Sequence, residues 1–182
     1  LWNSVLEFRS DRIAQIDAAG EEPMLAMNLK NAIPTEIAHA MNLSEATIWR
    51  IIRQSQSVLG GAPSAWDAFA DGAIDAQRVS YIANALDELK TDEAKAELDA
   101  RVVAYATTHT PAELKAWLKI LVARLEPAEF EERCERERAE RSIEIVHVET
   151  GMSFINAYLP PPAVVAISQR LRLAAKQLED DP

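Results

Sequence analysis

Apolar side chains recur every three or four residues along most of the chain, the spacing that places them on one face of an α-helix. Stretches that end helices separate these segments, and Gly60-Gly61-Ala62-Pro63 is the clearest of them. The pattern predicts helices over residues 2–19, 24–32, 66–70, 76–89 and 163–177, two more within residues 34–52, and others beginning near residues 91 and 111.

Several of these helices have recognisable start signals. Asp75 and Thr91 stand where an N-cap is expected, because their side-chain oxygens can accept a hydrogen bond from a free N–H of the first turn. Thr110-Pro111-Ala112-Glu113 has an N-cap Thr, Pro at the first helical position and Glu at the third. These signals predict that helices begin at residues 76, 92 and 111.

Only one part of the chain has the pattern of strands. Residues 142–149 and 152–159 are rich in Ile, Val and aromatic residues and flank a turn-like Thr150-Gly151, which predicts a β-hairpin. An isolated hairpin is marginal in water, so we expect it to pack on the helices or on sequence outside this chain. The predicted fold is therefore mainly α, a multi-helix domain that contains a helix-turn-helix and one small β-hairpin near the C-terminus.

The stretches that end helices, together with the hairpin, divide the chain into three regions. They are N-terminal helices with the helix-turn-helix (1–59), a helical bundle region (60–141), and the hairpin with a last helix (142–182). We expect them to form one compact unit. Because the chain begins Leu1-Trp2 without Met, we also expect it to be part of a longer protein, truncated before a downstream module.

Residues 34–52 are predicted to form the helix-turn-helix, with Pro34 opening its first helix. Ile37 faces the partner helix, and Ala38 is small enough to allow a close crossing. Asn42 stands in the turn, where its tolerance of the left-handed conformation is useful. Ser44 is placed to cap the second helix.

In a DNA-binding helix-turn-helix, the start of the second helix reads base edges while flanking polar groups contact phosphates. Glu45 is unfavourable for contact with the DNA backbone, because its carboxylate and the phosphates are both negative. Trp49 is large for a side chain that enters a DNA groove, so we expect it to pack on a neighbouring helix. The candidate base readers are Thr47 and Arg50, and the candidate phosphate contacts are Thr35, Ser44, Arg53 and Gln54.

The charge of the chain limits this interpretation. A net charge of −10 argues against a large nucleic-acid surface, because phosphates are neutralised by Lys and Arg. Residues 1–58, however, hold seven acids and five bases, so a local DNA-reading surface remains open there. The same pattern also serves as a packing unit in proteins that do not bind DNA.

Residues 128–141 alternate Glu and Arg three and four apart, which supports an exposed helix. A solvated connecting helix is the simpler interpretation, and a charged partner surface is the alternative. The single cysteine, Cys134, excludes an internal disulfide, and no signal peptide or membrane span is evident. We therefore expect a cytoplasmic protein with no membrane association.

The ordered set of motifs resembles the actinobacterial family called domain of unknown function 222, also known from a mycobacterial repeat family. The resemblance spans nearly the whole chain and rests on Glu36-Ile37-Ala38 with Leu43-Ser44, residues 65–75 before Arg78-Val79, Thr110 to Lys115, Arg124-Leu125-Glu126-Pro127, Gly151-Met152 and Leu159-Pro160. It implies a position N-terminal to an HNH endonuclease module, in proteins associated with mobile or phage-like elements.

No catalytic site, cofactor or metal is predicted within this chain. An HNH site needs clustered histidines on a metal ion, whereas His39, His109 and His147 are far apart in sequence without neighbours at ligand spacing. His39 is expected to be exposed and His147 to be a hydrogen-bonded structural residue. The resemblance carries over no active site, and the full-length protein is the place to expect an endonuclease.

Two functions are therefore weighed. The first is a non-catalytic domain that binds double-stranded DNA or targets an HNH endonuclease-like protein to it. The second is a protein-interaction or oligomerisation module that regulates a linked nuclease, in which case the partners are a second copy of the chain or the downstream nuclease module. An independent enzyme is the third and weakest alternative.

Overall fold

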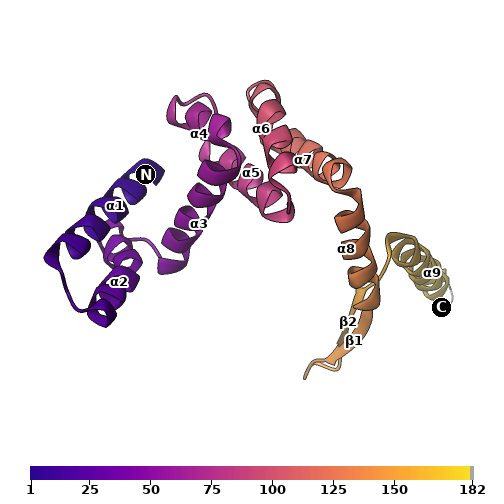
Figure 1. Ribbon diagram of the computed structural model, residues 1–182. Coiled ribbons are helices and arrows are strands. Elements are labelled where there is room, and N and C mark those ends of the chain that lie inside the picture. Colours follow the sequence, from indigo (N-terminus) through magenta and orange to yellow (C-terminus); the bar gives the residue numbers. More distant parts are fainter. Residues whose placement is uncertain (181–182) are drawn as a thin grey trace. The chain divides into compact units, whose positions relative to one another are not determined.

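The computed structural model describes residues 1–180, with side chains described to Gln177. Within this range the chain forms nine helices and one antiparallel hairpin (Figure 1). The elements are α1 (Trp2–Ala19), α2 (Pro23–Met41), α3 (Glu45–Gly61), α4 (Pro63–Ala70), α5 (Ala76–Glu88), α6 (Asp92–Ala106), α7 (Pro111–Leu125), α8 (Pro127–Ala139), β1 (Ser142–His147), β2 (Ser153–Tyr158) and α9 (Pro161–Asp180). The mainly α fold with a hairpin near the C-terminus is confirmed.

The predicted start signals act as expected. The Asp75 carboxylate accepts from the N–H of Arg78 at 2.8 Å, and the Thr91 hydroxyl accepts from the N–H of Ala94 at 3.3 Å. Thr110 and Glu113 form a reciprocal capping box, in which each side chain accepts from the backbone N–H of the other. These local bonds fix where α5, α6 and α7 begin.

The prediction that Pro34 opens a new helix is wrong. Residues 24–32 do not form a separate helix, because α2 runs without interruption from Pro23 to Met41 with Pro34 inside it. Pro34 lacks the N–H for one helical hydrogen bond, which normally favours a break. Here Ile33, Pro34 and Ile37 are all buried in the core, so tertiary packing of this face outweighs the lost bond.

The chain divides into two compact units, which cut across the three regions expected from the sequence. Unit 1 is Leu1–Glu126 and unit 2 is Pro127–Pro182. In the sequence, the boundary is followed directly by Pro127, which starts α8 after the C-cap Glu126 of α7, and by the charged run over residues 128–141.

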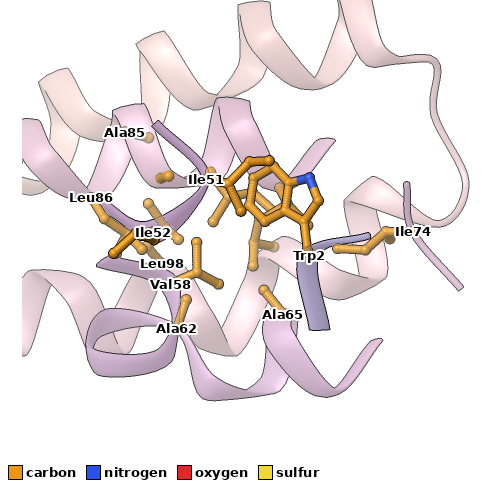
Figure 2. Close-up of a cluster of buried hydrophobic side chains, with 14 of the residues drawn as sticks. Trp2, Ile51, Ile52, Val58, Ala62, Ala65, Ile74, Ala85, Leu86 and Leu98 are labelled. Atoms are coloured by element: carbon orange, nitrogen blue, oxygen red, sulfur yellow. The ribbon is translucent and has the colours of Figure 1, made fainter. Parts of the chain in front are cut away.

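The core of unit 1 forms around α3. Figure 2 shows apolar side chains of α1, α3, α4, α5 and α6 meeting there, among them Trp2, Ile52, Ala65 and Leu98. Gly61 allows α3 and α5 to approach closely, because a Cβ at this position would lie 3.0 Å from the Leu86 side chain. All described residues with buried side chains lie in unit 1.

Charged side chains from distant helices complete the helix ends of unit 1. Asp99 of α6 accepts from the N–H groups of Ser64 and Ala65 at the start of α4. Arg78 of α5 donates to the carbonyls of Ala106 and His109 at the end of α6, at 2.9 and 2.8 Å. These bonds satisfy backbone groups that a helix cannot pair internally, and so fix how the helices pack.

Unit 2 has a different character. In β1 and β2, residues pair in a regular antiparallel ladder from Ser142–Tyr158 to His147–Ser153. Every residue of α8, β1 and β2, and every α9 residue with a described side chain, is exposed or only partly buried. Among the described residues, no helix is long and apolar enough to cross a membrane.

Candidate nucleic-acid interface

The turn between α2 and α3 is tight and well defined. Asn42 has φ 53° and ψ 45°, the left-handed conformation expected for it from the sequence. The N–H of Leu43 bonds to the carbonyl of Ala38 at 2.9 Å, which is the long hydrogen bond of a Schellman motif. Leu43 packs against the core, so the angle at which the chain leaves α2 is fixed.

The first turn of α3 is capped as predicted. The Ser44 hydroxyl accepts from the N–H of Thr47 at 3.2 Å, and the two hydroxyl groups lie 2.9 Å apart. Ser44 is exposed and Thr47 is half-buried. The arrangement places two hydroxyl groups and the free N–H groups of a helix start side by side, where an anion is favoured.

One face of α3 anchors the helix in the core. Ile48, Ile51 and Ile52 are at most 2% exposed. The remaining face is open to solvent and consists of Glu45, Ala46, Trp49, Arg50, Arg53 and Gln56. Because helical neighbours lie three and four residues apart, Arg50 and Arg53 share this face with the start of the helix.

Trp49 was expected to pack on a neighbouring helix, but it lies on the open face of α3. Its side chain is 49% exposed, next to Arg50 and Arg53 on the open face. The helical period explains the difference, because Ile48 and Ile52 already occupy the positions that face inward. The exposed ring offers a flat apolar surface beside two cationic residues.

Gln54 is removed from the set of candidate phosphate contacts. It is 4% exposed, and its amide is engaged with α5: Oε1 accepts from the Ser80 hydroxyl at 3.1 Å, and Nε2 donates to Asn84 Oδ1 at 3.5 Å. The signal was present in the sequence, since Gln54 lies three residues after Ile51 and therefore near the same face.

Thr35 is the only candidate that lies in α2 rather than in α3 or its cap. It is half-buried within α2, one residue after Pro34 rather than at a helix start. Its neighbour Glu36 forms an ion pair with Arg12 of α1 at 3.2 Å. The candidates that α3 and its cap bring together are therefore Ser44, Arg50 and Arg53, which are exposed, and Thr47, which is half-buried.

The local charge differs from that of the whole chain. Between Glu45 and Asp67 the sequence holds two arginines and no acid. The outer face of α3 beyond its first residue is therefore cationic, although the chain carries a net charge of −10. This charge distribution was readable from the sequence, but its placement on one exposed face required the fold.

The histidines do not come together. His39 is exposed on α2, as expected. His109 stacks on Tyr105 at 3.7 Å between ring centroids, and Tyr105 stacks in turn on Trp117 at 4.5 Å. His147 Nδ1 shares a hydrogen bond with the Ser153 hydroxyl across the hairpin, at 2.8 Å. Among the described residues, no three His, Cys, Asp or Glu side chains are grouped to hold a metal ion.

These features define a helical protein whose α2–turn–α3 segment exposes a small cationic face. The chain belongs to the family described as Domain of unknown function (DUF222), whose sequence pattern matches residues 9–181. Neither the curated proteins nor the solved structures contain a match to it.

Proposed function

We propose that unit 1 binds double-stranded DNA through the exposed face of α3, in the manner of a helix-turn-helix. The observation that carries the proposal is the cationic outer face of α3, held by a left-handed turn at Asn42 and a capped start at Ser44. In this arrangement Thr47 and Arg50 reach base edges in the major groove, while Ser44 and Arg53 contact phosphates.

The acidity of the chain sets the expected strength of binding. Few cationic groups are available, so phosphate contact alone gives dissociation constants of about 10⁻⁴–10⁻⁶ M. Binding is expected to weaken steeply with salt, because each neutralised phosphate releases counterions. We further propose that the domain directs a linked catalytic module to DNA. The family resemblance supports this proposal, because it implies a position before an HNH endonuclease module.

The test is fluorescence anisotropy with a labelled duplex at low salt. Arg50→Ala with Arg53→Ala is expected to weaken binding about tenfold or more and, because Arg53 is the phosphate contact of the two, to lower the salt dependence by about one phosphate contact. The matched control is Arg101→Ala with Arg124→Ala, which removes the same charge from exposed positions of α6 and α7. Equal losses in both double variants would contradict a specific role for α3.

A protein partner is the second candidate for this surface. Exposed Trp and Arg side chains are the residue types that dominate protein interfaces, and Trp49 lies beside Arg50 and Arg53. Binding of duplex DNA that is unaffected by Trp49→Ala but reduced by the arginine double variant would favour DNA. No DNA binding by the wild-type chain would leave the protein-interaction alternative.

A further inference from the structure

Unit 2 leaves a large amount of apolar surface in contact with water. Its most exposed apolar side chains include Ile143 (61%), Phe154 (61%), Ile155 (64%) and Leu173 (64%). The elements make few contacts beyond the hairpin itself, and a groove of about 730 Å³ lies between α8 and residues 158–162. No described side chain of unit 2 is buried, so these residues lack the core that a stable fold of this size needs.

The hairpin also has two open edges. Edge strands are normally protected by Lys, Pro or a bulge, because their free N–H and C=O groups pair readily with another chain. β2 (Ser-Phe-Ile-Asn-Ala-Tyr) contains no Pro and no charge, and its ladder with β1 is regular. Two hairpins side by side would form a four-stranded sheet, which meets the usual requirement of three or more strands.

One face of such a sheet is apolar. The register places Ile143, Ile145, Ile155 and Ala157 on the same side of the hairpin, because Ile143 pairs with Ala157 and Ile145 with Ile155. α9 carries a matching stripe, since Val164, Ile167 and Leu171 follow one another three and four residues apart. A helix of this kind is suited to cover the apolar face of a sheet.

The charged residues of α8 and α9 indicate which chain covers the apolar face of the hairpin. α8 is acidic, with Glu131 and Glu135 exposed one turn apart, whereas Arg172 and Lys176 are exposed one turn apart on α9. These two ridges are complementary in charge, and among the described residues few contacts join α8 to α9 within one chain. In a symmetric self-interface, such a pair of complementary ridges meets twice, once in each direction.

We propose that unit 2 is a dimerisation module that completes its core with unit 2 of a second copy. The two hairpins join along their β2 edges, and α9 of one copy lies with Arg172 and Lys176 against Glu131 and Glu135 of the other. An interface of this kind uses about 20–30 residues from each chain, which unit 2 can supply. The inference does not depend on DNA binding by unit 1.

The test is a charge exchange monitored by light scattering coupled to size-exclusion chromatography. The wild-type chain is expected to be a dimer at ~100 μM. Variant A carries Glu131→Lys with Glu135→Lys, and variant B carries Arg172→Glu with Lys176→Glu. Each alone is expected to dimerise at least about tenfold more weakly, because like charges then face each other at both contacts.

Mixing the two variants distinguishes pairing between two chains from pairing within one chain. In an A–B pair both contacts again join opposite charges, so the mixture is expected to recover a dimer. If α8 and α9 paired within one chain, mixing would rescue nothing. A monomeric wild-type chain, unchanged dimers in either variant, or folded variants that fail to pair on mixing would each overturn the proposal; circular dichroism verifies folding.

Discussion

At the scale of single residues, Glu126 is a buried carboxylate of unit 1 that accepts several hydrogen bonds. It is 9% exposed, and it accepts from the N–H of Lys90, the N–H of Thr91 and the Thr91 hydroxyl at 2.7–3.0 Å. Burial alone raises the pKa of Glu126, but the bonds from Lys90 and Thr91 together hold that pKa below its ordinary value. The end of α7 is thereby tied to the start of α6.

We predict that Glu126→Gln lowers the free energy of unfolding by about 1–3 kcal/mol at pH 7, because an amide cannot accept all of these bonds. A lowered pKa in the folded state stabilises the protein above the ordinary pKa of Glu, and this contribution is lost as the pH falls through the folded-state value. The difference in the free energy of unfolding between wild type and Glu126→Gln should therefore narrow as the pH falls below about 4.5.

Urea unfolding followed by circular dichroism at several pH values measures this difference. Glu7→Gln, at an exposed position of α1, is the matched control and should change stability little at any pH. A Glu126→Gln variant as stable as wild type at pH 7 would show that these bonds contribute nothing net.

Sequence reasoning identified side chains whose partners are close in the chain and missed those whose partners are distant. Asp75, Thr91 and Thr110 cap their own helices, so their roles could be read from spacing. The hydrogen-bond partners of Glu126 lie 35 and 36 positions before it in the sequence. Those of Gln54, Ser80 and Asn84, are also distant, so no local pattern reveals either set. Their roles depend on how the helices pack.

At the scale of elements, the turn between α2 and α3 decides where the cationic face points. Asn42 adopts φ 53°, a conformation that costs an ordinary residue about 1–2 kcal/mol and a β-branched residue more. We predict that Asn42→Val destabilises unit 1 by about that amount, whereas Asn42→Gly is close to neutral because Gly adopts this conformation readily.

Thermal unfolding of the two variants measures the effect, and DNA anisotropy shows whether the turn also matters for binding. Asn42→Gly is expected to retain binding, since it preserves the backbone geometry. Equal stability of Asn42→Val and Asn42→Gly would mean that the left-handed turn does not hold α3 in place.

The helix patterns predicted most elements because apolar spacing and caps are local, but they misplaced the break in α2. Pro34 is a strong local signal for a helix start, yet Ile33, Pro34 and Ile37 bury one continuous face against the rest of unit 1. Likewise the division after Glu126 follows from which helices share a core, although the charged run over residues 128–141 begins directly after it. Local signals fail where packing energy exceeds local preference.

At the scale of the whole molecule, the two proposals combine into a measurable consequence. A dimer carries two copies of α3, so the binding of one to DNA raises the effective concentration of the other. A cationic face with only Arg50 and Arg53 gains most from such pairing, because a single copy has few phosphate contacts. We therefore predict that the wild-type chain binds duplex DNA at least about tenfold more tightly than a monomeric variant.

Variant A separates this effect from simple electrostatics. Glu131→Lys with Glu135→Lys changes the net charge from −10 to −6, so charge alone would strengthen its binding to DNA. Pairing predicts the opposite, namely that variant A binds more weakly than wild type and recovers when mixed with variant B. Tighter binding by a monomeric variant A would show that dimerisation does not assist DNA contact, while leaving the role of α3 to be decided by the Arg50 and Arg53 substitutions.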